Sequence, residues 1–593
     1  MSTNADVMPP IVAGSFSGEQ KRYLEGFFAG AAAGGVTFAQ LGEARQEIAT
    51  APSSLTSASH PALEDLTREE RLKRELHPFD ATEELLLKAR FNAKPESDDV
   101  FRFKWNGLFW LSPVKEGYMC RLRIPGGVIR SDQLREVAAI ARELTTGYIQ
   151  ITTRNNLQVR LIEPKDCPEV LRRIQGCGLH SKGAGADNIR NITMSPCAGY
   201  DPHELIDVRP FVHELATLIV SSREFYDLPR KFNIAFDGGG AISSAEDTND
   251  IGIAALKIGA NAAGITPGIY FRFLLGGVTG HQTFASDWGV IVLPEQVIRV
   301  SAALIREFIK FGDRTDRKKA RFKYVVASRG LAQILADVEQ QTGLVLTKLA
   351  PDSELIEPRS VSQQGHGHIG THAQKQPGLH YIGAGVPVGQ LTARQLERVA
   401  DVADSYGTGE VRLTIWQNLI VPNVSTAFVE SASRALRKAG LDMVQSNVRS
   451  GFVACTGSRY CKFAASDTKG HALKVMEYLD ARLSLEQPVN IHFTGCANSC
   501  AQHFMGDIGL LGTKVRSSVS GEGYHVTVGG GFGENRKIGR QIFSGVPAES
   551  VGPTLEAMLR AYLAARLPEE SFHNFCNRHS VGELQILFAG EHG

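Results

Sequence analysis

The chain has 593 residues, which is too long for one hydrophobic core, so we expect two to four domains of roughly 100–200 residues each. Its 64 lysines and arginines balance 63 acidic residues, and this balance gives no support for a nucleic acid or a membrane surface as partner. Nine cysteines in so long a chain are unlike the dense, even pattern of a small disulfide-linked secreted protein. The apolar stretch "GFFAGAAAGGV" is far shorter than the roughly 20 residues that span a bilayer. We therefore expect a cytoplasmic protein.

The N-terminal part differs in composition from the rest. Residues 17–46 are predicted to form one or two helices, and a Ser-, Ala-, Thr- and Pro-rich linker follows. Residues 1–95 are therefore assigned to a helical arm with a linker. From about residue 98, short β-rich runs alternate with amphipathic helices, as in α+β or α/β proteins.

A far-separated internal repeat organises the remainder. The stretch 124–159 aligns without gaps to 386–421, so that Pro125 matches Pro387 and Asn156 matches Asn418, 262 positions later. Each copy reads as a turn, an amphipathic helix and a strand, and a further helix follows, at 168–176 and 425–439. One distant repeat indicates duplication of a large unit and not a solenoid.

A weaker similarity extends the duplication. "FNIAFDGGG" (232–240) resembles "VNIHFTGCA" (489–497), and each is followed by Gly-rich strand ends. The chain then reads as small, large, small and large units, which we place at residues 96–175, 176–350, 351–445 and 446–593.

Four cysteines occur in two pairs near the C-terminus, Cys455 with Cys461 and Cys496 with Cys500. Four thiolates suit structural zinc or an iron–sulfur cluster. The five residues between Cys455 and Cys461 favour the cluster, while zinc and unligated core cysteines stay open as alternatives. A Thr-Gly beside each pair would let backbone N–H groups reach cluster sulfurs.

These cysteine motifs carry a specific resemblance. "CTGSRYCKFAASDTK" and "TGCANSC" resemble the two cysteine motifs of the nitrite/sulfite reductase family, and the similarity runs from about residue 98 to the end. It implies an α+β fold with two ferredoxin-like half-domains and two larger cofactor-binding α/β units, related by pseudo-twofold symmetry. It also implies a [4Fe–4S] cluster on Cys455, Cys461, Cys496 and Cys500, with Cys500 bridging to the iron of a sirohaem.

Sirohaem bears many carboxylates, so its protein must supply cations and polar amides. Candidates occur on predicted strands of the repeat, where alternation places Arg154, Gln158 and Arg160 on one face; an exposed polar face is the alternative. The full set of candidates is Arg154, Asn155, Gln158, Arg160, Gln417 and Asn418. The basic segment "DRTDRKKARFKY" would on a helix usually be a solvated face. It resembles a family segment along the cofactor carboxylates, which makes Arg317, Lys319 and Arg321 candidates.

The resemblance implies a small oxyanion as substrate, and its reduction consumes protons. Four residues match the family's substrate positions: Arg121, Arg190, Lys231 and Asn233. Lys231 and Asn233 are two apart, so in an extended strand both point to one side. The neutral amide of Asn233 stands where the family's sulfite reductases commonly carry a lysine, which favours the monoanion nitrite.

We therefore predict the six-electron reduction of nitrite to ammonia, closest to the ferredoxin-dependent assimilatory enzymes of the family. The alternatives are sulfite reduction with the same cofactors, or a non-catalytic iron–sulfur or zinc protein. "GAGVPVG" is a poor dinucleotide motif, so electrons are expected from a separate protein, which the resemblance implies to be ferredoxin. His366, His368 and His372 are interpreted as part of a linker rather than as metal ligands.

Overall fold

The computed structural model describes residues 61–259 and 264–589. The helices expected within 17–46 lie outside these residues. The described part of the arm begins with two helices, α3 (Arg68–Glu75) and α4 (Thr82–Arg90), and α5 (Asp99–Arg102) follows. Within the described ranges, no helix is long and apolar enough to cross a membrane.

Two small sheets have matching strand orders, and each contains one strand from the other half of the chain. The first has the order β1-β2-β5-β4-β14, and the second has the order β12-β13-β16-β15-β3. Strand β14 pairs with β4, and strand β3 pairs with β15. The strands of the first sheet are β1 (Leu108–Trp110), β2 (Tyr118–Arg121), β4 (Tyr148–Ile151), β5 (Leu157–Ile162) and β14 (Gln390–Thr392). Those of the second are β12 (Gly370–Ala373), β13 (Leu379–Ala384), β15 (Glu410–Leu413), β16 (Leu419–Ser425) and β3 (Val128–Arg130).

The helices of the repeat close a core shared by both small sheets. Helix α6 (Ser131–Leu144) packs against α12 (Ala393–Tyr406), and both bury apolar residues at helical spacing. Leu134 and its repeat partner Leu396 lie in one cluster with side chains of both sheets. The backbone N–H of Gln395 donates to the Thr392 hydroxyl, and the Gln395 amide oxygen accepts from the Thr392 backbone N–H, which caps α12. Two further helices, α7 (Cys167–Gly176) and α13 (Val429–Lys438), confirm the predicted second helix of each copy.

Two larger sheets repeat a second pattern, in which the first three strands are parallel and the later ones antiparallel. One contains β6 (Thr193–Met194), β7 (Ile234–Asp237), β8 (Ile251–Ile258), β9 (Gly268–Leu275), β10 (Ser286–Val292) and β11 (Thr347–Lys348). The other contains β17 (Phe452–Ala454), β18 (Ile491–Thr494), β19 (Ile508–Lys514), β20 (Glu522–Val528) and β21 (Arg540–Pro547). Because strands β6 and β7 correspond to β17 and β18, the loops after them also correspond.

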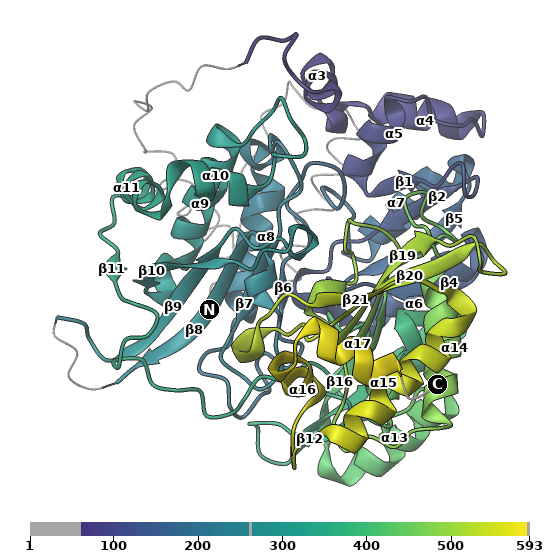
Figure 1. Ribbon diagram of the computed structural model, residues 1–593. Helices are drawn as coiled ribbons and strands as arrows, with labels where there is room; N and C mark the ends of the chain where they lie inside the picture. The colour runs from purple at the N-terminus through teal and green to yellow at the C-terminus, as the bar shows by residue number, and fades with distance from the viewer. Residues whose placement is uncertain (1–60, 260–263, 590–593) are drawn as a thin grey trace, which may run out of the picture.

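Helices cover both larger sheets. The first sheet shares a core with α8 (Arg209–Ser221), α9 (Val297–Phe311), α10 (Phe322–Arg329) and α11 (Leu331–Thr342). The second shares one with α14 (Thr468–Asp480), α15 (Val551–Ala565), α16 (Phe572–Arg578) and α17 (Val581–Ala589). Figure 1 shows the first group on the left, in teal, and the second at the lower right, in green and yellow.

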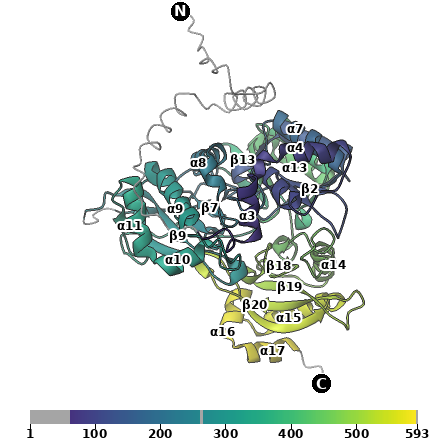
Figure 2. The same cartoon turned by 90° about the horizontal axis from the view of Figure 1, so that it is seen from above.

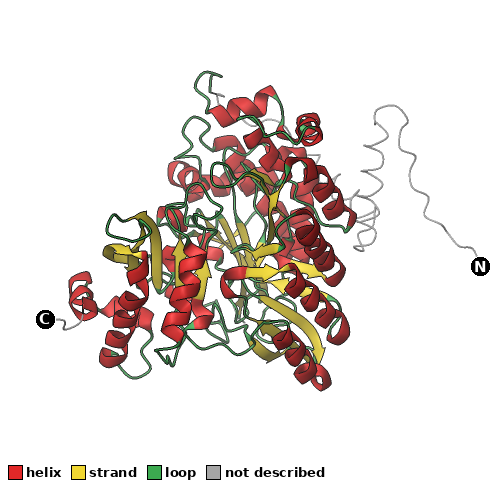
Figure 3. Cartoon of the chain, turned by 90° about the vertical axis from the view of Figure 1, so that its right-hand side faces the viewer, coloured by secondary structure: helices red, strands yellow, loops and turns green. Residues whose placement is uncertain are grey.

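The four sheets form three lobes. Figure 2 shows the paired small sheets at the upper right, the first larger sheet on the left and the second at the bottom. Helices and strands are mixed throughout the molecule, as Figure 3 shows. The α+β fold with a duplicated, pseudo-twofold arrangement is confirmed, while the unit boundaries stay predictions.

Candidate functional site

The four paired cysteines lie after two neighbouring parallel strands. Strand β17 ends at Ala454 and β18 at Thr494, and Ala454 is paired with Phe493 in the sheet. The carboxyl ends of the two strands therefore bring Cys455 close to the loop that begins at Gly495. The backbone N–H of Gly495 donates to the Cys455 sulfur at 3.2 Å. This contact is of the kind expected from the Thr-Gly pairs.

Three of these cysteines are partly exposed and Cys500 is exposed, and their thiols repel one another as thiolates. Loss of solvation, with a smaller contribution from the neighbouring Cys500, raises the pKa of Cys455 to about 11. Burial also raises the pKa of Cys496, with Cys500 and Cys461 adding to the effect. Thiols in this setting become thiolates only when a positive centre compensates them.

The cysteines approach one another without converging on a single point. Among residues 61–259 and 264–589, no three His, Cys, Asp or Glu side chains gather closely enough for one metal ion. Structural zinc needs all four thiolates about 2.3 Å from one ion. A [4Fe–4S] cluster instead takes one cysteine for each iron atom, which fits this donor set.

Arg121 and Arg190 meet opposite the cysteine loops. Arg121 ends β2, and its guanidinium lies over the ring of Phe109 at 4.5 Å. The guanidinium of Arg121 and that of Arg190 both donate to the carbonyl oxygen of Ala184, at 3.4 and 3.2 Å. Burial lowers the pKa of each arginine, and the thiols of Cys500 and Cys461 partly offset this for Arg121.

Lys231 and Asn233 precede strand β7 on either side of the fully buried Phe232. Burial is the main cause that lowers the pKa of Lys231 to about 8. The nearby Arg321 lowers this pKa as well, and the thiol of Cys500 opposes the change. The backbone N–H of Asn233 donates to a carboxylate oxygen of Asp250 at 2.9 Å. Lys231 and Arg121 therefore both interact electrostatically with the thiol of Cys500.

Arg160 connects the first small sheet to the first cysteine loop. On β5 its guanidinium donates to the side-chain oxygens of Gln150 at 2.9 Å and of Gln158, and to the Thr456 hydroxyl at 2.9 Å. It lies 5.4 Å from the ring centre of Tyr460. Burial lowers its pKa, and the nearby Arg121 lowers it further. Gln158 and Arg160 do share one face of the strand.

Arg154 does not lie on that strand face, so the predicted alternation is wrong for this residue. It occupies the turn between β4 and β5, because Asn155 takes a left-handed conformation with φ of 49°. Its guanidinium donates to the carbonyl oxygens of Asn191 at 2.7 Å and Ile234 at 3.1 Å, and to the side chain of Asn249 at 2.8 Å. Burial lowers the pKa of Arg154, with the nearby Arg321 and Arg121 adding to the effect.

Three amide candidates are bonded to the backbone, and none lies on a strand. The Asn155 amide donates to the carbonyl oxygens of Gly126 and Met194. Gln417, with φ of 63°, both donates to and accepts from the backbone of Ala454 at 2.9 Å. The Asn418 side-chain oxygen accepts from the Val386 N–H at 2.8 Å. These contacts hold the turns of the repeat and join one turn to strand β17.

The basic segment 313–321 precedes helix α10, which begins only at Phe322. Arg317 forms a two-bonded ion pair with Asp187, with both contacts at 2.8 Å. Arg321 pairs with Asp250 at 2.7 Å, and Lys319 is exposed. Arg317 therefore reaches the loop that carries Arg190, and Arg321 reaches the carboxylate that holds the backbone of Asn233, whereas Lys319 does neither.

Two residues at the site were not predicted from the sequence. The Thr153 hydroxyl donates to the carbonyl oxygen of Cys500 at 2.9 Å. Lys469 is buried, donates to the carbonyl oxygen of Val388, and has a pKa lowered by burial to about 7, an effect that the nearby Cys455 opposes. Lys469 is the last residue of the cysteine motif 455–469, and a lysine so close to these cysteines could have been predicted as a site residue from the sequence.

The surplus of poorly solvated cations agrees with an anionic ligand. For Arg154, Arg160, Arg190 and Lys231, loss of solvation is the main cause of a lowered pKa and other cations add to it. The pKa of Arg121 is lowered by the same loss of solvation, which the thiols of Cys500 and Cys461 oppose. Cations buried together without enough acidic partners need a compensating anion. A tetrapyrrole with many carboxylates, or an oxyanion substrate, has this chemistry. The residues present therefore fit sirohaem beside a cluster.

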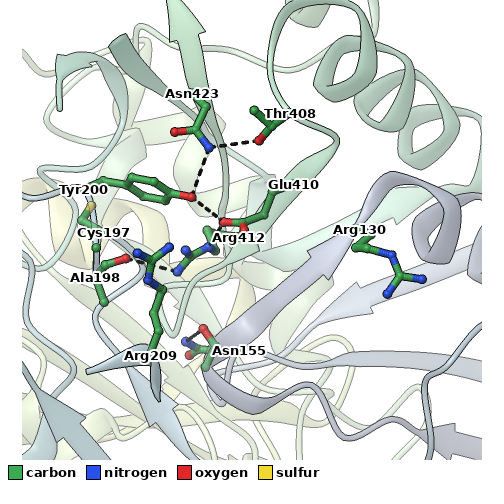
Figure 4. Close-up of polar contacts among 12 residues, drawn as sticks. Arg130, Asn155, Cys197, Ala198, Tyr200, Arg209, Thr408, Glu410, Arg412 and Asn423 are labelled. Atoms are coloured by element: carbon green, nitrogen blue, oxygen red, sulfur yellow. Dashed lines mark hydrogen bonds and ion pairs between the residues drawn. The ribbon is translucent and has the colours of Figure 1, made fainter. Parts of the chain in front are cut away.

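The pseudo-twofold symmetry places a second pair of a tyrosine and an arginine, Tyr200 and Arg412, in a setting like that of Tyr460 and Arg160, but with a different charge balance. Tyr200 follows β6 as Tyr460 follows β17, and the guanidinium of the buried Arg412 lies 4.9 Å from its ring centre. Figure 4 shows that Arg412 and the hydroxyl of Tyr200 both reach Glu410. A carboxylate of the protein thus neutralises Arg412, whereas Arg160 has neutral side-chain partners.

His366 and His368 lie in the irregular segment that connects β11 to β12, and only His372 falls outside the predicted linker. His366 and His368 are buried, and the His366 ring packs 4.9 Å from that of Trp416. His372 belongs to strand β12 and stacks on Tyr381. Burial lowers the pKa of both His366 and His368, so they are neutral packing residues.

Comparisons with known proteins agree with this geometry. The model of the nitrite and sulphite reductase 4Fe-4S domain matches residues 185–346 and 445–584. The model of the nitrite/sulfite reductase ferredoxin-like half domain matches residues 112–177 and 372–439.

Individual relatives cover most of the chain. A ferredoxin–nitrite reductase of Leptolyngbya laminosa is 36% identical over 85% of this chain and 99% of its own. The chloroplastic ferredoxin–nitrite reductase of Spinacia oleracea is 33% identical over 79% of each chain. The solved structure of Mycobacterium tuberculosis NirA matches with a TM-score of 0.79 and 26% identity, covering 88% of this chain and 97% of that one. Together with the cysteine loops and the duplicated sheets, these matches show that the chain belongs to the nitrite and sulphite reductase family.

Proposed function

We propose that this protein reduces nitrite to ammonia, using sirohaem and a [4Fe–4S] cluster and taking electrons from reduced ferredoxin. The observation that carries the proposal is the group of three poorly solvated, half-buried cations, Arg121, Arg190 and Lys231, of which Arg121 and Lys231 interact with the thiol of Cys500. Cations gathered in a poorly solvated site attract a small anion and stabilise negative charge that develops on it.

The two arginines of this group have one role and the lysine has another. Arg121 and Arg190 share the carbonyl oxygen of Ala184, which fixes their guanidinium groups for binding an oxyanion. Arginines hold their protons tightly, so they serve as permanent charges. Lys231, with a pKa lowered to about 8, can give up a proton near neutral pH. It is the group we assign to proton delivery, and its charge also helps to bind the anion.

The two cofactors would be held by different sets of residues. Cys455, Cys461, Cys496 and Cys500 would hold the cluster, and Cys500 would also bridge to sirohaem. Arg154 and Arg160, whose hydrogen-bond partners are neutral, would compensate the sirohaem carboxylates, with Gln158 supporting Arg160. Arg317 and Arg321 would face the same group from their ion pairs with Asp187 and Asp250. When bound, the pair would supply single electrons and an iron atom on which nitrogen–oxygen bonds can be broken.

Nitrite is favoured over sulfite because of Asn233. Its amide adds no charge beside Lys231, and its backbone is held against the carboxylate of Asp250. A less cationic site suits a monoanion better than a more highly charged oxyanion. The named ferredoxin–nitrite reductases among the relatives support the same choice.

A ferredoxin donor agrees with the absence of a convincing nucleotide-binding motif in the sequence and with the names of the relatives. We further propose a cytoplasmic location. All nine cysteines lie within the described residues, and none of them forms a disulfide bond.

Purified holoenzyme tests the proposal directly. We expect an absorption spectrum with sirohaem bands and one ammonia formed for each nitrite consumed, with reduced ferredoxin as donor. The Arg190→Met variant should retain the bands and lose most turnover, because Arg190 is assigned to the substrate. A wild-type protein without sirohaem bands, or with no ammonia formed, would contradict the proposal.

A further inference from the structure

Helix α3 lies against the turn that leads into Lys231, although it precedes the first family-model match, which begins at residue 112. The ammonium group of Lys73 donates to the carbonyl oxygen of Leu228 at 2.8 Å. Lys73 is 7% exposed and its ion-pair partner on the same helix, Glu70, is 1% exposed. A buried pair of opposite charges on an arm helix needs more explanation than simple packing.

Glu70 of this pair also binds Arg314, which holds Asp227 next to Leu228. Glu70 accepts from the guanidinium of Arg314 at 2.7 Å, and Arg314 in turn binds the carboxylate of Asp227 at 3.1 Å and its carbonyl oxygen at 2.8 Å. The backbone N–H of Thr67 donates to the carbonyl oxygen of Arg314 at 3.0 Å. Asp227 and Leu228 are therefore held from two directions by Arg314 and Lys73.

The held turn has little freedom of its own. Leu228 is fully buried, and Pro229 packs so closely on Gly312 that an added Cβ there would lie 2.4 Å from the proline ring. Phe232, directly after Lys231, is also fully buried. Between these fixed points only Arg230 and Lys231 are partly exposed. The position of Lys231 is thus set largely by where Asp227 and Leu228 are held.

Helix α3 is also linked, through Arg317, to the loop that carries Arg190. Glu69 lies 3.6 Å from Arg317, which forms the two-bonded pair with the buried Asp187. Asp187 opposes the lowering of the Arg190 pKa, so the two side chains are close. One short helix therefore touches the supports of two proposed substrate ligands.

We propose that Glu70 and Lys73 are positioning residues for the substrate pocket, acting through Asp227 and Leu228 on Lys231. The inference rests on the proposed function of Lys231 and assigns part of the arm to the active site. Removing one partner of a buried charge network leaves the other charges uncompensated, so the network favours a single arrangement. Loss of Lys73 should let the Lys231 turn shift, which weakens binding of the anion and also slows the proton delivery assigned to Lys231.

The test compares Lys73→Met with Lys94→Met in the holoenzyme. Lys94 is a matched control, because it is also a paired lysine before the first small sheet but pairs with Glu116 at the exposed surface. We expect Lys73→Met to raise KM for nitrite and the Kd from spectral titration with nitrite by about fivefold or more, and to lower kcat because proton delivery slows. Hydrogen exchange should quicken at 227–233, and Lys94→Met should match the wild type.

Unchanged KM, Kd and exchange at 227–233 in Lys73→Met would overturn the inference, even if its melting temperature falls. If Lys73→Met yields no folded holoenzyme, Glu70→Gln replaces it, and an unchanged nitrite Kd in that variant would overturn the inference equally. Lys231→Met separates this result from the proposed function. If Lys231→Met leaves nitrite affinity intact, the proposed pocket is wrong; if it weakens affinity while the Lys73 and Glu70 variants do not, only the positioning role is wrong.

Discussion

The hydroxyl of Thr153 donates a hydrogen bond to the carbonyl oxygen of Cys500 at 2.9 Å. Thr153 belongs to the turn of the first small sheet, and Cys500 belongs to the loop after β18 in the last sheet. Arg154, the next residue, reaches the carbonyl oxygen of Ile234 in the third lobe. The site is therefore a junction of all three lobes, and Cys500 stands at its centre.

Replacement of Cys500 by serine should remove the coupled centre. A serine hydroxyl is a poor ligand for iron at neutral pH, so both cluster content and sirohaem absorbance should fall several-fold. Cys177→Ser is the control, since Cys177 is a free cysteine that caps the C-terminal end of α7. Iron analysis and absorption spectra measure the change. A Cys500→Ser enzyme with full iron content and full activity would refute the bridging role.

Nitrite reduction should weaken as the pH rises through about 8. Burial lowers the pKa of Lys231 to about 8, so its charged form is complete below that pH and is lost above it. Because kcat/KM reports the free enzyme, its decline should have an apparent pKa near this value. The Lys231→Met variant should have a lower kcat/KM and no decline in this range. If the variant keeps the same pH profile as the wild type, the titrating group is not Lys231.

Arg160→Met should reduce retention of sirohaem. The change removes the bonds to Gln150, Gln158 and Thr456 and one of the buried charges that compensate carboxylates. We expect several-fold less sirohaem for each chain, measured as the ratio of sirohaem to protein absorbance. Arg172→Met is the control, because Arg172 pairs with Glu169 on the exposed face of α7. Equal sirohaem content in both variants would show that Arg160 does not support the cofactor.

Asn233→Lys should shift selectivity toward sulfite. The new ammonium group adds a second charge beside Lys231, which favours the more highly charged oxyanion. The ratio of kcat/KM for nitrite to that for sulfite should fall by about tenfold, roughly 1.4 kcal/mol of differential binding. Asn233→Gln controls for side-chain size. An unchanged ratio in Asn233→Lys would mean that this position does not set selectivity.

Much of the fold was predictable because the duplication is visible as a gapless match between two stretches of the sequence. The match of Leu134 to Leu396 predicted equivalent helices, and these helices form one core. The exchange of β3 and β14 was not predictable, because both strands are three residues long and pair with residues hundreds of positions away. Local pattern carries no information on such pairings.

The cysteines were predictable from spacing and resemblance, while the polar candidates were only partly so. Arg154 was placed on a strand because alternation looked regular, but the left-handed Asn155 turns the chain there. Gln417 and Asn418 looked like cofactor ligands, yet the turns of the repeat use their amides for backbone bonds. Glu70 and Lys73 gave no signal, because their burial depends on Arg314 and Leu228, far away in the chain.

Steady-state kinetics with nitrite and sulfite test the central claim most directly. The assay uses the holoenzyme, reduced ferredoxin as donor and ammonia or sulfide as the measured product. With Asn233 beside Lys231, we predict that kcat/KM for nitrite exceeds that for sulfite by at least about tenfold. A kcat/KM for sulfite equal to or above that for nitrite would contradict the account.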